Sequence, residues 1–426
     1  MNSQYLEKHT KDMKSDLPRL MRERDLDALV IFGSDGFGPA NAPFIYFVGD
    51  AHVTSGLVIV KANGEAYLVH HPMERDEAAK TGLQLVNKAA YNLPALIQQH
   101  GGDRLAADVA LMRRIFSDLG IQGRVAFYGA DHVNVSYSLL SALSRAEVCE
   151  VVAEPEHDVI SVARATKDAD EVDRIRRTCQ LTETLIGETR DYLRGHRLAG
   201  EVLRTPDGQP LTVADVKRFI RARACALGLE MSDCIFAIGR DAGVPHSSGT
   251  PGAPITVGKT IIFDIFPRGP GGYHCDITRT WCLGHAPAHV WRAYELVKQA
   301  HALAEARFNT EEHTYAFNEA VCDLFEANGY PTIRQDYAAT RGYVHSLGHG
   351  FGLSVHEAPA ISLKGLRPDE KFQVGSVFCS EPGLYDPDDP CGGWGVRIED
   401  DYWCTPEGRF ERLTTFDHDL VIPLAR

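Results

Sequence analysis

An aspartate inside a run of apolar residues places the strongest constraint on how this chain can fold. Asp264 lies within the segment IIFDIF at residues 261–266. Isoleucine and phenylalanine favour a β-strand, and so many apolar neighbours predict that the strand is buried. An ionised carboxylate there costs several kcal/mol unless a cation or several hydrogen-bond donors compensate it. The segment therefore predicts a buried strand whose aspartate has a compensating partner.

A second aspartate follows after a turn. Asp276 lies beyond the segment RGPGG at residues 268–272, which supplies the glycine and proline of a tight reversal. An antiparallel return would bring Asp276 beside Asp264 on one face, because side chains alternate with a period of two. Two neighbouring buried anions repel, and a shared metal ion would turn that repulsion into attraction.

The same plan recurs later in the chain. Residues 259–281 and 376–403 each place an acid at an apolar strand, then a Gly/Pro turn, then another acid, with a longer turn in the second segment. In the second segment the acids are Glu381 and Glu399. Two hairpins that each offer two carboxylates predict a pseudo-twofold arrangement around one site.

Three histidines lie between the hairpins, in the segment HSLGHGFGLSVHEAP at residues 345–359. Its alternating glycines argue against a helix, so a His-x-x-x-His metal site on a helix is disfavoured. Four acids with one histidine would hold two divalent ions, and a hydroxide bridging them would serve as the nucleophile. Oxygen-rich ligation with one imidazole favours Mn, Fe, Co or Zn, and Mn is the first choice.

Each of these residues also fits a purely structural role. A lone acid in a strand often pairs with arginine, and Arg397 lies close to Glu399 in sequence. Cys275 and Cys379 flank the acids, but better ligands are present, so packing is the expected role of both thiols. The order of hairpin, histidine segment and second hairpin is more specific than any of its parts.

Patterns in the rest of the sequence predict two domains. Short runs rich in branched residues alternate with helical patterns over the first 160 residues, which indicates an α/β domain. From residue 166 to residue 193 an apolar stripe predicts the opening helix of a second domain. We expect domains at residues 1–160 and 161–426.

Composition narrows the classes of function. The formal charge of −14 disfavours nucleic acid as a partner. The start MNSQYLEKHTKDMKSD is too polar for a secretory signal, and no apolar run is long enough to span a membrane. The ten cysteines form no C-x-x-C pair, which indicates reduced thiols. We expect a cytoplasmic protein that does not bind a membrane.

The order of the five candidate ligands resembles that of a known metallopeptidase family, which contains proline aminopeptidase, prolidase and methionine aminopeptidase. The resemblance rests on the motifs DITRT, HSLGHGFG, SEPGLY and VRIEDD, over roughly residues 240–402, and the two-domain plan covers the whole chain. It implies an α/β N-terminal domain followed by an α+β catalytic domain of the pita-bread (creatinase/aminopeptidase-like) fold with pseudo-twofold symmetry. It also implies ligands to two metal ions at Asp264, Asp276, His349, Glu381 and Glu399, with Asp276 and Glu399 as bridges.

The resemblance assigns roles to further residues. Glu381 would also take the proton of the attacking water. His356 and His246 would contact the substrate and assist the reacting amide. His345 would support the site from behind the ligands, and Arg397 would brace the ligand carboxylates.

Family members with an N-terminal domain of this size cleave Xaa-Pro bonds, so the resemblance implies an Xaa-Pro dipeptidase or aminopeptidase that acts on small peptides, and it also implies a homodimer. Arg367 lies near the position where prolidases place an arginine that grips the free carboxylate of a dipeptide. Two alternatives stay open: a metal-dependent non-peptidase hydrolase or lyase of the same fold that acts on a small molecule, and a non-catalytic binding protein. Binding proteins of this fold typically lose ligands, and none is lost here.

Overall fold

The chain divides into two compact units, which meet in sequence between Ala163 and Arg164. The structure is a computed structural model, and it describes residues 14–33, 41–54, 56–129 and 132–424. The polar stretch at residues 1–13 lies outside these ranges. The expected domain limits at residues 160 and 161 stay a prediction, three residues from the division between the two units.

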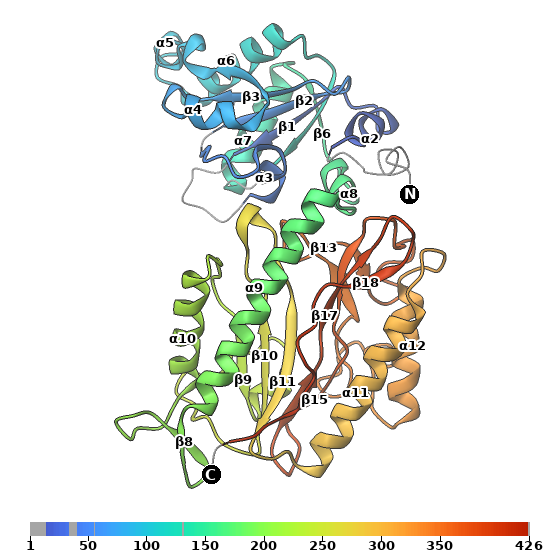
Figure 1. Cartoon of the computed structure of the whole chain (residues 1–426). Coiled ribbons are helices and arrows are strands. Elements are labelled where there is room, and N and C mark those ends of the chain that lie inside the picture. Colours follow the sequence, from blue (N-terminus) through green and yellow to red (C-terminus); the bar gives the residue numbers. More distant parts are fainter. Residues whose placement is uncertain (1–13, 34–40, 55, 130–131, 425–426) are drawn as a thin grey trace, which may run out of the picture. The chain divides into compact units, whose positions relative to one another are not determined.

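The N-terminal unit is built on a mixed sheet of order β4-β3-β2-β1-β5-β6 (Figure 1). Strand β1 pairs antiparallel with β2 and parallel with β5. The described elements are α2 (Leu17–Glu23), β1 (Ala28–Phe32), α3 (Ala42–Val48), β2 (Leu57–Lys61), β3 (Ala66–His70), α4 (Arg75–Ala78), β4 (Gln84–Asn87), α5 (Leu93–Gln99), α6 (Arg104–Leu119), β5 (Arg124–Tyr128), α7 (Val133–Arg145) and β6 (Glu150–Val152). The strands and helix expected from the apolar runs of this half are therefore present.

The C-terminal unit opens with a long, firmly capped helix. After α8 (Val159–Arg164), helix α9 (Ala169–Arg194) begins with a capping box in which Asp168 and Glu171 each bond the other's backbone N–H. The box satisfies two donors that the first turn would otherwise leave free. The predicted apolar stripe of α9, from Val172 to Leu193, is buried. Sequence periodicity thus located this helix to within a few residues.

One half of this unit pairs two helices with a sheet of order β19-β11-β10-β9. Helix α9 runs along this sheet with α10 beside it (Figure 1). The elements of this half are β7 (Arg197–Ala199), β8 (Val202–Arg204), α10 (Val213–Ala226), β9 (Ile235–Ile238), β10 (Thr260–Ile265), β11 (Ile277–Leu283) and β19 (Val421–Ile422). Strands β10 and β11 are buried along their whole length, which is why both read as apolar runs.

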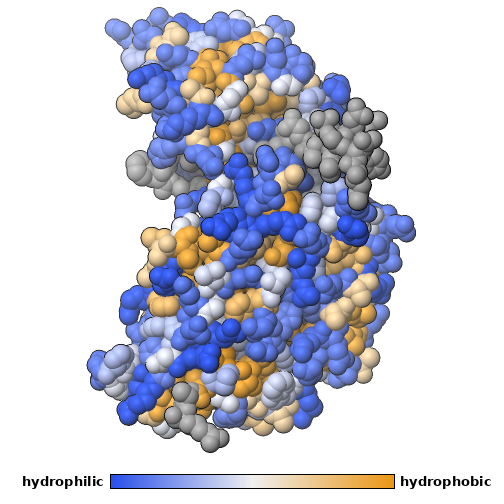
Figure 2. All heavy atoms as spheres, viewed as in Figure 1, coloured by the Kyte–Doolittle hydropathy of each residue, from blue (hydrophilic) through white to orange (hydrophobic). Residues whose placement is uncertain are grey.

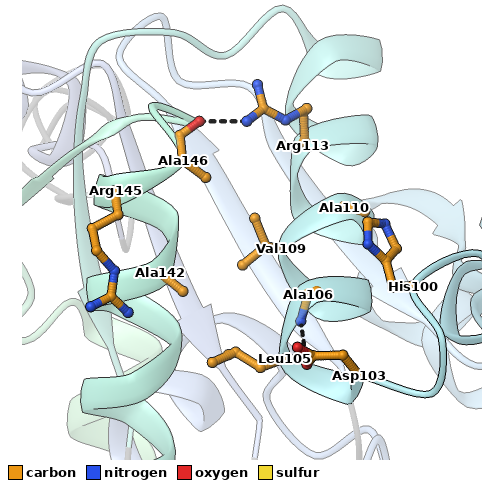
Figure 3. Close-up of a pocket in the computed structure, with 10 residues that line it drawn as sticks. All are labelled: His100, Asp103, Leu105, Ala106, Val109, Ala110, Arg113, Ala142, Arg145 and Ala146. Carbon is orange, nitrogen blue, oxygen red and sulfur yellow. Dashed lines mark hydrogen bonds between the residues drawn. The ribbon is translucent and has the colours of Figure 1, made fainter.

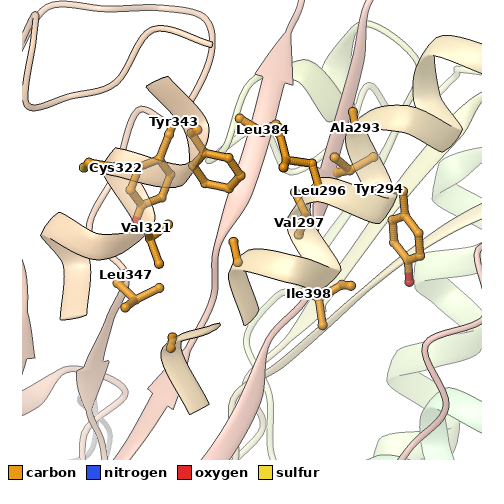
Figure 4. Close-up of a cluster of buried hydrophobic side chains, with 14 of the residues drawn as sticks. Ala293, Tyr294, Leu296, Val297, Val321, Cys322, Tyr343, Leu347, Leu384 and Ile398 are labelled. Carbon is orange, nitrogen blue, oxygen red and sulfur yellow. The ribbon is translucent and has the colours of Figure 1, made fainter. Parts of the chain in front are cut away.

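The other half pairs α11 and α12 with a sheet of order β13-β12-β14-β17-β18 and with the hairpin β15-β16. Its elements are α11 (Ala288–Arg307), α12 (Tyr315–Ala327), β12 (Gly348–Gly350), β13 (Glu357–Ile361), β14 (Val377–Ser380), β15 (Gly383–Asp386), β16 (Trp394–Arg397), β17 (Asp400–Cys404) and β18 (Phe410–Arg412). Figure 4 shows the core of this half, in which Leu296 and Val297 of α11 and Val321 of α12 belong to one cluster of buried side chains with Leu384 and Ile398. The two halves repeat the arrangement of a helix pair on a sheet.

The surface of both units is mainly polar. Hydrophilic residues predominate on the face seen in Figure 2, with hydrophobic residues in scattered groups between them. Within the described ranges, no helix combines the length and apolar character that a membrane crossing requires.

The glycines of the histidine segment let neighbouring strands approach each other. A Cβ atom at Gly348 would lie 2.0 Å from the carbonyl oxygen of Cys379, and one at Gly350 would lie 2.2 Å from that of Ala358. The structure thus gives these glycines a packing role, which is to let β12 fit between β13 and β14.

We predict that Gly348→Ala lowers the free energy of unfolding by at least about 1–3 kcal/mol, the usual cost of overpacking. The added methyl would force β14 away from β12. Urea denaturation measures the loss. Gly365→Ala is the matched control, because a Cβ there meets no atom within 4 Å. Equal stability of the two variants would show that β12 and β14 are not tightly packed.

Candidate metal centre

The two aspartates of the first hairpin share one face of a buried sheet. Asp264 of β10 lies opposite Thr278 of β11, and Ile265 lies opposite Ile277. Asp276 directly precedes β11, two residues from Thr278, so its side chain lies on the same face as that of Asp264. The two residues are nearly inaccessible, at 8% and 4% exposure. The antiparallel return expected from the sequence is confirmed.

The two glutamates come from the second half of the unit. Glu381 follows β14, and its N–H donates to the carbonyl oxygen of Leu347 at 2.7 Å. Glu399 lies between β16 and β17, and its Oε2 accepts from the hydroxyl of Thr278 at 2.7 Å. We expected a long turn between the two acids. This turn is itself the hairpin β15-β16, in which Gly383 pairs with Arg397 and Asp386 pairs with Trp394. The hydrogen bond from Thr278 to Glu399 therefore joins the two glutamates to the hairpin that carries the two aspartates.

His349 points one ring nitrogen toward the acids. Its Nδ1 lies 3.2 Å from the carbonyl oxygen of Gly350, while Nε2 lies 3.8 Å from Asp276 Oδ2 and 3.8 Å from Glu381 Oε1. Burial lowers the pKa of the ring to about 4, so the imidazole is neutral at pH 7. A neutral ring that donates from Nδ1 keeps a lone pair on Nε2, directed to the side where the carboxylates lie.

Charge at the cluster favours a bound cation. Burial raises the pKa of Asp264 to about 6, and it raises the pKa values of Asp276 and Glu381 well above the usual range; the charge of Glu399 adds to each shift. Arg397 is the cation that opposes this effect at Asp264 and Glu381. Within the described residues, Oδ1 of Asp264 is buried without a hydrogen-bond partner. Crowded acids and a neutral imidazole are a donor set that fits divalent metal ions.

Arg397 supports Asp264 directly, and a tyrosine links His345 to Arg397. The guanidinium of Arg397 donates to Asp264 Oδ2 and, at 3.0 Å, to the hydroxyl of Tyr385. The same hydroxyl lies 2.8 Å from Nε2 of His345, whose Nδ1 lies 2.8 Å from the carbonyl oxygen of Ser346. Burial lowers the pKa of His345 to about 3, so its neutral ring donates from Nδ1 and accepts a hydrogen bond from the tyrosine hydroxyl at Nε2. His345 thus contacts the network behind the ligands.

Two further histidines border the cluster. The rings of His356 and His349 lie 4.1 Å apart between centroids. Burial lowers the pKa of His356 to about 4, and the charges of His349 and His246 act in the same direction. The charge of His246 also acts on Asp264. His246 and His356 are exposed, so both are accessible to a substrate.

A family model decides how these residues are to be interpreted. Residues 173–406, which contain all five candidate ligands, match the model of metallopeptidase family M24. The chain belongs to this family. Membership makes the protein a metallopeptidase that uses divalent metal and acts on peptides, as the sequence motifs predicted.

Individual M24 relatives and solved structures agree. The chain is 27% identical over 297 residues to the "Probable dipeptidase PepE" of Mycobacterium tuberculosis, which covers 69% of this chain and 70% of that protein. It is 27% identical over 266 residues to the Xaa-Pro dipeptidase of Pyrococcus furiosus, which covers 62% and 67%. The structure superposes on that of an Xaa-Pro dipeptidase from Bacillus anthracis with a TM-score of 0.73 at 22% identity, over 97% of this chain and 100% of the other. The predicted pita-bread fold is confirmed.

Arg367 of this M24 protein lies outside the cluster described above. It is in an exposed loop, its side chain is 49% exposed, and its Nε lies 3.8 Å from Glu370 Oε1. A substrate role for Arg367 therefore stays a prediction.

Glu357 is a residue of the M24 site that sequence reasoning missed. It directly follows His356, and its carboxylate accepts hydrogen bonds from Arg164 and, at 3.0 Å, from Lys167. All three residues lie in the C-terminal unit, and their side chains are at most 9% exposed. The buried ion pairs fix the start of β13 to the segment before α9. The partners lie about 190 residues apart, so no local pattern could have indicated this contact.

A cavity of about 470 Å³ lies away from these residues, in the N-terminal unit of the M24 protein. Figure 3 shows it between α6 and α7, lined by small residues such as Ala106 and Ala142, with Arg113 donating to the carbonyl oxygen of Ala146. Its lining gathers no group of acids and histidines comparable to that of the C-terminal unit, so we assign it no part in the chemistry.

We predict that Glu357 stabilises the protein in a pH-dependent way. Burial alone would raise the pKa of Glu357, but Lys167 and Arg164 lower it to about 2, against an ordinary value of 4.5. A depressed pKa stabilises the folded state above pH 4.5 and loses its effect as the pH falls toward 2. The difference between the ordinary and the lowered pKa of Glu357 corresponds to about 3 kcal/mol of folding stability.

Urea denaturation of Glu357→Gln should therefore show a lower free energy of unfolding than wild type at pH 7. The two proteins should converge as the pH falls from about 5 toward 2. The exposed pair of Arg409 and Glu407 offers the control Glu407→Gln, for which we expect little change. A constant difference between Glu357→Gln and wild type at every pH would contradict the assignment.

Proposed function

We propose that this chain is a dinuclear metallopeptidase in which Asp264, Asp276, His349, Glu381 and Glu399 hold two divalent ions. The observation that carries the proposal is the group of buried, mutually repelling carboxylates with a neutral imidazole nitrogen beside them. When bound, the ions would polarise the scissile carbonyl and supply a nucleophilic water at neutral pH. Asp276 and Glu399 would be shared by the two ions, as the resemblance to the family implies.

The remaining groups of the site handle protons and orient the substrate. Glu381 would accept the proton of the attacking water, the role that the resemblance to the family assigns to it. The rings of His356 and His246 bind the substrate, and either can donate a hydrogen bond to the carbonyl oxygen as negative charge develops there. Arg397 orients Asp264 directly, and Tyr385 links His345 to Arg397.

We propose Xaa-Pro dipeptides and short Xaa-Pro peptides as substrates. The support comes from the M24 relatives named as dipeptidases or Xaa-Pro dipeptidases. The nitrogen of an Xaa-Pro bond carries no hydrogen, so selectivity depends on a pocket shaped for the ring and on donors to the carbonyl. Arg367 would bind the free carboxylate of a dipeptide.

Three finer assignments complete the proposal. Mn²⁺ is the first choice for the oxygen-rich part of the site, with Co²⁺, Zn²⁺ or Fe²⁺ as alternatives. The protein would act in the cytoplasm and as a homodimer. The metal site would lie entirely in the predicted C-terminal domain, residues 161–426.

The test is the release of proline from a matched Xaa-Pro dipeptide and Xaa-Pro-Yaa tripeptide, with and without added Mn²⁺. We expect metal-dependent hydrolysis, no measurable activity in Asp276→Asn, and a fall of about 100- to 10,000-fold in kcat for His356→Ala, the usual contribution of a general acid–base group. His285→Ala, an exposed histidine away from the cluster, is the control and should keep full activity.

The outcomes separate the possible functions. Cleavage of both peptides indicates an aminopeptidase, and cleavage of the dipeptide alone indicates a dipeptidase. Full activity of protein stripped of metal would refute the mechanism. Cleavage of neither peptide by the Mn²⁺-loaded protein would refute the proposed substrate class and leave a non-peptidase of the same fold.

A further inference from the structure

A cysteine lies beside the nitrogen that His349 directs toward the acids. Cys379 of β14 is fully buried, and its Sγ lies 3.6 Å from Nε2 of His349. One ligand atom from each of Asp276, His349, Cys379 and Glu399 lies within 4.8 Å of the other three. The structure thus places sulfur, nitrogen and two oxygens around one point, whereas the sequence had indicated packing as the role of Cys379.

The distance between Cys379 Sγ and His349 Nε2 matches the distance expected between two ligand atoms of one metal ion. Zinc bonds to thiolate sulfur at about 2.3 Å and to imidazole nitrogen at about 2.0–2.1 Å, so a tetrahedral angle between them separates the two atoms by about 3.6 Å. A hydrogen bond could also hold the two side chains at this distance. The nearby acids favour the metal, because a lone hydrogen bond would leave their repulsion uncompensated.

Independent observations indicate that a cation belongs here. Oδ1 of Asp264 is buried and has no hydrogen-bond partner among the described residues, and the carboxyl group of Asp264 interacts electrostatically with Glu399. The other thiol cluster, formed by Cys179, Cys275 and Asp401, also has a buried carboxylate oxygen without a partner in the described part of the chain, Asp401 Oδ1, but the second oxygen, Oδ2, accepts from the thiol of Cys179 and from the N–H of Asp276. That second cluster contains no imidazole, and hydrogen bonds explain most of its contacts.

We propose that Cys379 is a thiolate ligand, together with His349, Asp276 and Glu399, to one of the two metal ions, and that it makes this position select Zn²⁺, Co²⁺ or Fe²⁺ over Mn²⁺. The inference rests on the proposed metal-dependent function and deepens it. Soft sulfur ligands favour the later transition metals, while oxygen ligands suit Mn²⁺. Binding releases the thiol proton to solvent, so metal uptake at this position also acidifies the medium.

The test is the absorption spectrum of the full-length protein after titration with Co²⁺. A Co²⁺–thiolate bond gives a charge-transfer band in the near ultraviolet, and carboxylate or imidazole ligands do not. We expect the band in wild type and in the control Cys282→Ser, a buried cysteine of β11 that belongs to neither cluster. The band should be absent from Cys379→Ser, which still binds Co²⁺. Bound Co²⁺ without a band in wild type, or a band that survives in Cys379→Ser, would overturn the inference.

Metal competition and X-ray absorption give readouts that do not depend on catalysis. Loss of a group that merely supports a metal ligand typically costs about 10- to 100-fold in affinity. The preference for Zn²⁺ over Mn²⁺ should therefore fall by at least about 10-fold in Cys379→Ser. If that variant fails to fold, X-ray absorption of the Zn²⁺-loaded wild type decides, because a sulfur neighbour at about 2.3 Å supports the inference and a shell of only nitrogen and oxygen overturns it.

These outcomes are separate from failure of the proposed function. If the protein binds no divalent ion, both the proposed function and the role of Cys379 as a ligand are refuted. A protein that binds Co²⁺ through oxygen and nitrogen alone, and cleaves Xaa-Pro peptides, refutes only the role of Cys379.

Discussion

Four carboxylates crowd one region of the fold: Asp264, Asp276 and Glu399 are buried, the side chain of Glu381 is 17% exposed, and Arg397 is the cation that directly contacts Asp264. One guanidinium cannot neutralise several acids, so burial and the remaining repulsion together raise the pKa values of Asp276 and Glu381 well above the usual range. The backbone holds the acids together at this cost. Structures that store such repulsion usually do so for function, and divalent ions are the partner that best relieves it.

The two-half architecture explains how the acids are held. Each half supplies a pair of acids from a hairpin or from the ends of strands, and the bond from the Thr278 hydroxyl to Glu399 connects the two sets. Arg279 strengthens this connection, because its guanidinium donates to the backbone oxygen of Glu399 at 2.7 Å and pairs with buried Asp400 at 2.7 Å. The pair of Arg279 and Asp400 thus fixes the backbone that carries Glu399, and a fixed backbone keeps the ligand geometry rigid.

Much of this could be predicted from sequence, because the informative patterns are local. The apolar strand around Asp264, the turn before Asp276 and the stripe on α9 each follow from periodicity, and the structure contains all three. Contacts between distant segments could not be predicted in this way. The hydrogen bond of Tyr385 to His345 and the ion pairs of Glu357 depend on how the chain packs, and the glycines of β12 serve strand contact, which no motif indicates.

The number of metal ions bound per chain, and its dependence on one bridging acid, tests the central claim most directly. After loading with Mn²⁺ and removal of free metal, elemental analysis counts the ions, and electron paramagnetic resonance shows whether they are coupled. We expect two coupled ions in wild type and loss of the coupled pair in Glu399→Gln. Retention of two coupled ions by Glu399→Gln, or wild-type protein that retains no Mn²⁺, would contradict the assignment of these acids as a shared metal site.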